Sequence, residues 1–171
     1  MVRVISLLFV ALALFVACSH ECTTVGCKNG ASVSILTVDG TWVDGAYSLE
    51  IDFDDDAYLC TFTTPDDSPD ESGAWQALDC SPSLDAFLAP VVACESHDIG
   101  MSSSQTCGPV AGQFYVQTKA AGTPKALHVL LTRDDETVLD DSRTLGYASV
   151  QPNGPDCDPT CQQASVQLVV P

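Results

Sequence analysis

Cysteines are the residues most able to do chemistry in this chain of 171 residues, which contains nine of them. Cys18 stands apart at the end of an apolar N-terminal segment, and an even number remains: Cys22, Cys27, Cys60, Cys80, Cys94, Cys107, Cys157 and Cys161. In a chain exported to an oxidising compartment, such a set indicates a disulfide framework. A zinc site is disfavoured, because no pair has the C-x-x-C spacing.

The pairing within this framework stays open, because many connectivities are compatible with one sequence. Proximity along the chain ranks two short and two medium-range pairs first: Cys22 with Cys27, Cys157 with Cys161, Cys60 with Cys80, and Cys94 with Cys107. The short loops would stabilise least, because the constraint on the unfolded chain grows with loop length.

Acidic residues form a second cluster that could bind an ion. Asp52, Asp54 and Asp56 have the alternate spacing with which a calcium loop presents oxygen ligands, and Asp55 adds a carboxylate. The EF-hand pattern fails, because Ala57 stands where that loop needs glycine. These four aspartates are therefore weak calcium candidates, and solvated turns rich in aspartate are the simpler interpretation.

Catalytic patterns are scarce, so we predict neither an enzyme nor a cofactor. Residues 102–104 are serines close in sequence to His97 and Asp98, the side chains of a hydrolytic triad. Polar loops collect the same residue types, however, and triads are defined by geometry rather than proximity. His128 is expected to be an ordinary exposed side chain on the polar side of a strand. A secreted hydrolase is the least favoured functional class.

The two tryptophans are the remaining candidates for a binding surface. Trp42 lies between two glycines, where an exposed indole would stack on a sugar ring. The favoured alternative is that Trp42 fills the space between two sheets, because large aromatic side chains bury most of their area. Trp75 is the second candidate for contact with a glycan.

Net charge excludes one class of partner. The chain has 23 Asp and Glu against 6 Lys and Arg, a formal net charge of −17. A field of that sign repels the phosphate backbone, so a nucleic-acid partner is not expected.

An export signal precedes these residues. Arg3 supplies a positive start, and the almost wholly apolar run 4–17 is shorter than the roughly 20 residues that span a bilayer. The segment resembles a bacterial lipoprotein signal, which implies cleavage before Cys18 and acylation of its thiol. Phe15 departs from the usual leucine of that pattern, so plain secretory cleavage is the alternative. Ser19 resembles an outer-membrane sorting residue. The protein is expected in the cell envelope, as an outer-membrane lipoprotein held to the membrane through a lipid anchor. The alternative is a secreted protein.

Beyond the N-terminal segment, the alternation of apolar and polar residues indicates β-strands. Residues 47–53 and 58–62 alternate apolar and polar side chains around an acidic turn at 55–57, which predicts a hairpin. Residues 126–131 and 137–139 repeat the pattern around 133–136, and 164–170 read as a closing strand. We therefore predict an all-β fold, an antiparallel immunoglobulin-like β-sandwich stapled by disulfides.

The organisation follows from these elements. Residues 1–17 are the predicted signal peptide, 18–30 a tether and 31–171 the sandwich domain. A short helix is predicted at 83–88, with Ser83 as its cap and Pro90 as its stop. Residues 65–73 and 95–108 are predicted as exposed loops.

A C-terminal pattern carries a further resemblance. The stretch 151–164, with Pro-Asn-Gly-Pro at 152–155 followed by Cys157, Pro159 and Cys161, resembles a pattern in uncharacterised lipoproteins of myxobacterial type. The resemblance implies a location in the cell envelope and a fold class, but no activity. The resulting expectation is a non-enzymatic envelope lipoprotein with a structural or binding role and an unknown protein or glycan partner. A calcium- or glycan-dependent adhesion module is the alternative.

Overall fold

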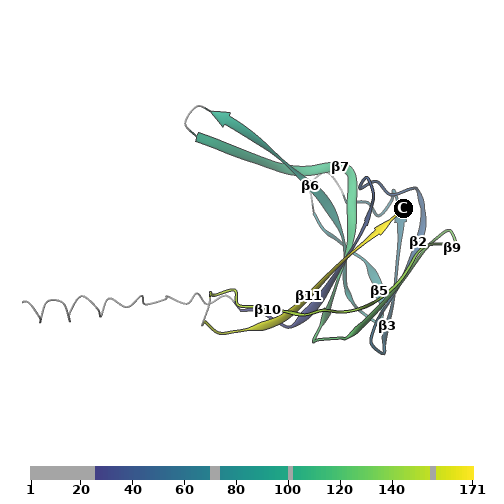
Figure 1. The fold of residues 1–171 in the computed structure, drawn as a ribbon. Helices are drawn as coiled ribbons and strands as arrows, with labels where there is room; N and C mark the ends of the chain where they lie inside the picture. The colour runs from purple at the N-terminus through teal and green to yellow at the C-terminus, as the bar shows by residue number, and fades with distance from the viewer. Residues whose placement is uncertain (1–25, 70–73, 100–101, 155–156) are drawn as a thin grey trace, which may run out of the picture. The chain divides into compact units, whose positions relative to one another are not determined.

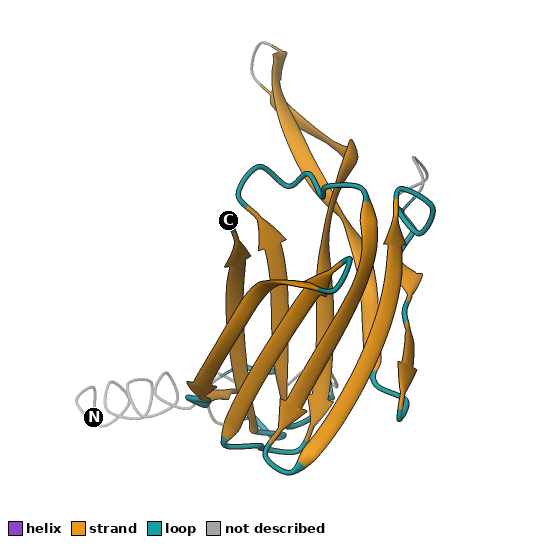
Figure 2. Ribbon diagram, turned by 90° about the vertical axis from the view of Figure 1, so that its right-hand side faces the viewer, coloured by secondary structure: helices purple, strands orange, loops and turns teal. Residues whose placement is uncertain are grey.

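The computed structural model describes residues 26–69, 74–99, 102–154 and 157–171, without the side chains of 97–99 and 102–104. Cys18 and Cys22 therefore lie outside the described residues. Strands account for the regular structure within these ranges, and no helix occurs there (Figure 2). The strands are β1 Gly30–Thr37, β2 Gly45–Phe53, β3 Asp56–Thr64, β4 Gln76–Ala77, β5 Asp79–Ser81, β6 Asp85–Ile99, β7 Ser102–Ala121, β8 Ala126–Arg133, β9 Glu136–Thr144, β10 Ala148–Val150 and β11 Cys161–Val170.

The chain forms two compact units. The larger, Lys28–Val150 with Cys161–Pro171, contains every described strand, and the smaller comprises Met1–Cys27 and Gln151–Thr160. In the described part of the smaller unit, Gly154 N donates to Gln151 O at 3.1 Å and Asn153 Nδ2 donates to Asp158 O at 2.7 Å. Gly154 has a φ of 100°, which favours glycine. Residues 151–154 therefore form a turn.

Two sheets share one hydrophobic core in the larger unit. Their strand orders are β10-β11-β1-β7-β6-β4 and β5-β3-β2-β8-β9. Side chains that alternate along each strand face the common core, which includes Val33, Leu49, Leu88 and Val129, each fully buried. The prediction of an all-β, two-sheet fold is confirmed.

One ladder differs from the predicted antiparallel arrangement. β1 pairs with β11 in parallel, from Gly30 opposite Gln163 to Thr37 opposite Val170. These are the first and last strands of the unit, so no tight turn between them dictates an antiparallel direction.

The hairpin predicted at 47–62 is confirmed as β2 and β3. Tyr47, Leu49, Ile51 and Phe53 are at most 5% exposed, and the residues between them are not buried. Phe53 pairs with Asp56, so the turn consists of the two residues before Asp56 and lies one position earlier than predicted.

The two acidic turns hold each other's strands. Asp54, in the β2–β3 turn, accepts hydrogen bonds from the N–H groups of Lys125 and Ala126 at 2.8 and 2.7 Å, where β8 begins. Asp134, in the β8–β9 turn, accepts one from Ala46 N at 3.0 Å, where β2 begins. Because β2 and β8 are antiparallel neighbours, each turn lies beside the start of the other strand. Each carboxylate thereby accepts hydrogen bonds from backbone N–H groups where one of these two interior strands begins.

Two local predictions are wrong, and β6 explains both. Residues 85–88 belong to a strand rather than a helix, because Ala86 and Leu88 alternate into the core. Pro90 lies at a register shift in the β6–β7 ladder instead of ending a helix, and a bulge tolerates its missing N–H. Beyond that shift, 92–99 and 102–109 pair with each other and extend past the sheets as a two-stranded arm (Figure 1). Residues 95–99 and 102–108, which the sequence predicted to be part of an exposed loop, therefore belong to a strand pair.

Both medium-range disulfides are present. Cys60 is bonded to Cys80, opposite it in the β3–β5 ladder, and Cys94 to Cys107, opposite it in the arm. Cys27, Cys157 and Cys161 are also disulfide-bonded.

Candidate functional site

The loop between β1 and β2, residues 38–44, turns sharply back into the fold. Gly40 N donates to Thr37 O at 3.2 Å, and Thr41 N donates to the Asp39 carboxylate at 2.9 Å, as in an Asx-turn. Gly40 has a φ of 78°, and a Cβ there would lie 3.1 Å from the Gln113 side chain. Phe114 N then donates to Gly40 O, which fixes the loop against β7. This geometry directs the following residue, Trp42, inward.

Trp42 is a core residue, as favoured from the sequence, and is 5% exposed. Its indole stacks on Phe114 of β7, with ring centroids 5.4 Å apart, and meets Tyr47 and Phe62 edge-on at 5.2 and 5.5 Å. Its Nε1–H donates to Phe114 O at 2.8 Å. Trp42 thus joins the two sheets and is not available as an exposed sugar platform.

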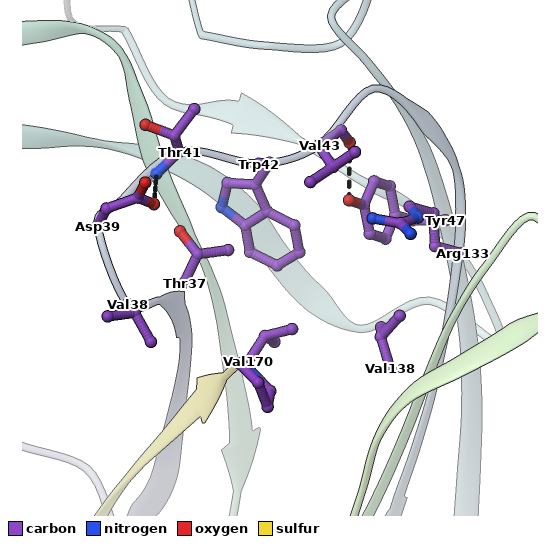
Figure 3. A pocket seen from close by; sticks show the side chains of 11 residues that line it. Thr37, Val38, Asp39, Thr41, Trp42, Val43, Tyr47, Arg133, Val138 and Val170 are labelled. Atoms are coloured by element: carbon purple, nitrogen blue, oxygen red, sulfur yellow. Dashed lines mark hydrogen bonds between the residues drawn. The ribbon is translucent and has the colours of Figure 1, made fainter.

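A cavity of about 490 Å³ opens beside Trp42, next to the β1–β2 loop and the end of β11 (Figure 3). Its lining is mostly apolar and comes from separate segments: Thr37, Val38, Asp39, Thr41, Trp42, Val43, Tyr47, Arg133, Val138, Val170 and Pro171. Val38 and Val43 are 78% and 60% exposed, although both are large and apolar. Cavities of this size and lining are the usual form of small-molecule sites.

Tyr47 and Arg133 provide the polar groups beside the apolar wall. The Tyr47 hydroxyl donates to Val43 O at 2.7 Å, and Arg133 lines the same cavity. Burial raises the pKa of Tyr47 above its usual value, although Arg133 opposes that shift. The hydroxyl therefore stays neutral at physiological pH. The guanidinium has five N–H groups, so Arg133 has donors left for a ligand.

Sequence reasoning missed this site. Arg133 was assigned only to a turn, Tyr47 only to a core face, and Val170 only to a closing strand. The available signal was the loop itself, in which Val38 and Val43 place apolar side chains beside a glycine turn. That signal is weak by itself, because single apolar residues are common on protein surfaces.

The calcium candidates are divided among different partners. Asp52 Oδ2 lies 3.2 Å from His128 Nδ1, and Asp54 accepts the two backbone N–H groups at the start of β8. Asp55 and Asp56 are exposed at the turn. Among the described side chains, no group of three His, Cys, Asp or Glu is arranged to hold a metal ion.

His128 is more tightly held than predicted. On the outer surface of the sheet β5-β3-β2-β8-β9 its Nδ1 contacts Asp52 and its Nε2 contacts Asp140 Oδ1 at 3.0 Å. Hydrogen bonds to Asp140 and then Asp52 raise the pKa of His128 above its ordinary value. Each ring nitrogen therefore has a carboxylate partner, and the arrangement of Asp52, His128 and Asp140 is called the carboxylate clamp below.

The residues weighed, and disfavoured, as a hydrolytic triad lie in the arm. His97 is opposite Ser104 and Asp98 opposite Ser103 in the ladder, but the side chains of all of them are outside the described part. Trp75, by contrast, is 52% exposed. In the part of the chain that the structure covers, no helix has the length and apolarity to cross a membrane.

Comparison with known proteins adds no relative to this picture: no family model, no curated protein and no solved structure matches the chain.

Proposed function

We propose that this chain is a non-enzymatic binding protein of the bacterial cell envelope, anchored to the outer membrane through a lipid on Cys18. The Trp42 cavity would bind a small, mostly apolar molecule. The observation that supports this role is the cavity's lining, in which Trp42, Val138 and Val170 form an apolar wall beside the hydrogen-bonding groups of Tyr47 and Arg133.

The exposed mouth supports the same role. Val38 and Val43 together offer apolar surface that costs free energy when it faces water, and a bound apolar molecule would cover it. His128 is the histidine with a described side chain, and it contacts carboxylates rather than a nucleophile. This arrangement favours binding over hydrolysis.

The immunoglobulin-like assignment remains part of the proposal. Its support is the pair of facing sheets with alternately buried residues. The central place of β1, between β11 and β7, distinguishes this topology from the simplest form of that class.

Nile red, an uncharged apolar dye, tests the cavity. We expect its emission to increase and shift to the blue on titration with the native protein. Val43→Asp should reduce this response severalfold, because it places a charge at the apolar mouth. Val169→Asp is the matched control, since Val169 is 48% exposed but does not line the cavity. An equal response from both variants would refute the cavity as the binding site.

The anchor requires a separate measurement. The intact mass of the protein from its native envelope should show cleavage before Cys18 and an excess of acyl size. A mass without acyl chains would replace the lipoprotein with a secreted protein and would leave the cavity proposal unaffected.

A further inference from the structure

Trp75 stands out as the largest exposed aromatic side chain in the described chain, with 52% of its surface accessible. It precedes β4 and leans on Phe87 of β6, with ring centroids 5.9 Å apart and planes inclined at 60°. Lys119 of β7 places its Nζ 5.8 Å from the indole centroid. The indole is therefore held in place by two neighbouring strands while half of it faces solvent.

Hydrogen-bonding side chains continue from this ring across the outer surface of its sheet. Phe87 lies opposite Gln117, Gln117 opposite Ser34, and Ser34 opposite Gln167. The residues between them, such as Leu88, are buried in the core, so these four share the outer side. The result is an apolar ring at one end of a row of amides and hydroxyls.

The side-chain oxygen of Gln117 is not used in the hydrogen bonding of the fold. No donor reaches its Oε1 within the described residues, although the atom is buried. A buried carbonyl without a donor costs free energy. The amide can therefore turn toward a ligand hydroxyl without breaking an existing bond.

Charge on this surface is balanced, unlike the chain as a whole. Among the described outward residues of β1, β11 and the sheet portions of β6 and β7, the charged ones are Asp85 and Lys119, which lie opposite each other. The outer surface of the second sheet carries Glu50, Asp52 and Asp140. A surface with one charge of each sign suits an uncharged polar ligand.

We propose that this surface binds a neutral carbohydrate. The C–H side of a pyranose ring would stack on the Trp75 indole, because both are flat and apolar there. Lys119 and Gln117 would hydrogen-bond the sugar hydroxyls, and Ser34 would extend the contact to a second sugar residue. The site is distinct from the Trp42 cavity, which has no residue in common with it.

Calorimetric titration with cellohexaose, maltohexaose and chitohexaose tests the proposal. We expect at least one of them to bind, and binding to weaken about tenfold or more in Trp75→Ala. Trp75→Phe should retain part of the affinity, because it keeps an aromatic ring. Leu59→Ala, a substitution of an exposed apolar residue on the other sheet, is the matched control and should bind as the native protein does.

Three results would overturn the proposal. They are the absence of binding to all three oligosaccharides at millimolar concentration, undiminished binding by Trp75→Ala, and a large loss of affinity between about 0.05 and 0.5 M NaCl, which would indicate a charged ligand. If Trp75→Ala fails to fold, Lys119→Ala provides the same test, since that side chain is exposed and should weaken binding severalfold.

Discussion

Two disulfides of this protein join opposed strand residues, yet their surroundings differ. Cys60 of the Cys60–Cys80 bridge is fully buried, whereas Cys94 and Cys107 are both exposed in the arm. In the sheets, a bridge adds to a core that is already packed. In the arm, where the described side chains are mostly exposed, the ladder and the bridge supply the order themselves. The same covalent bond therefore plays different parts in the two regions.

The largest effect is expected from removing the buried bridge. Cys60→Ala combined with Cys80→Ala should lower the free energy of unfolding by about 2 to 5 kcal/mol, because it releases the unfolded chain and also loses packing. Denaturant unfolding under oxidising conditions measures this. A loss no larger than that of the arm variant would contradict the contrast between the regions.

The second-largest effect on the free energy of unfolding is expected at the acidic turn between β2 and β3. Asp54→Ala removes the acceptor for two backbone N–H groups, and its φ of 54° suits alanine poorly, so we expect a loss of about 1 to 2 kcal/mol. Asp54→Asn keeps an acceptor and tolerates that backbone, and serves as the control. Equal destabilisation by both substitutions would show that charge, rather than hydrogen-bond geometry, matters at the turn.

One substitution in the sheets should stabilise the protein. Thr118 is fully buried, and its hydroxyl has no hydrogen-bond partner within the described residues. Thr118→Val removes that desolvated hydroxyl at similar volume, so the free energy of unfolding should rise by about 1 kcal/mol. A decrease would reveal a partner for the hydroxyl, such as a buried water.

His128 gives the sheets a small pH dependence. Its pKa is raised in the folded protein by Asp140 and Asp52, so its contribution is fully present below its unfolded value of about 6.5. That contribution disappears as the pH rises through the folded pKa. Unfolding curves at pH 6 and pH 9 should therefore differ less in His128→Gln than in the native protein, and an unchanged difference would exclude the clamp.

The arm should show the smallest global effect. Cys94→Ser with Cys107→Ser is expected to change the free energy of unfolding by less than about 0.5 kcal/mol, because neither residue is buried. Amide exchange within 92–99 and 102–109 should accelerate, since local opening no longer requires a closed bridge. A large global loss would mean that the arm is packed in solution.

Sequence alone predicted the strands that alternate strictly. β2, β3 and β8 have one buried side, so their period of two is visible in the residues. β6 was missed because its sheet portion is short and next to a proline, and the arm because exposed strands need no apolar alternation. In the arm, the pairing follows a register that differs from that of the sheet, and Cys94–Cys107 joins two opposed residues of it.

The candidate sites were predicted less well, for a physical reason. The Trp42 cavity gathers Thr37, Arg133 and Val170 from strands far apart in sequence, and the Trp75 surface depends on β6, β7 and β1 being neighbours. Both depend on strand order, which local periodicity does not encode.

The exchange of hydrogen bonds between the acidic turns bears on cooperativity. Opening the β2–β3 turn releases the start of β8, and opening the β8–β9 turn releases the start of β2. Neither hairpin can fray at its tip without exposing an amide of the other. The four strands should therefore open as one unit in hydrogen exchange, with Ala46 and Ala126 reporting the same event.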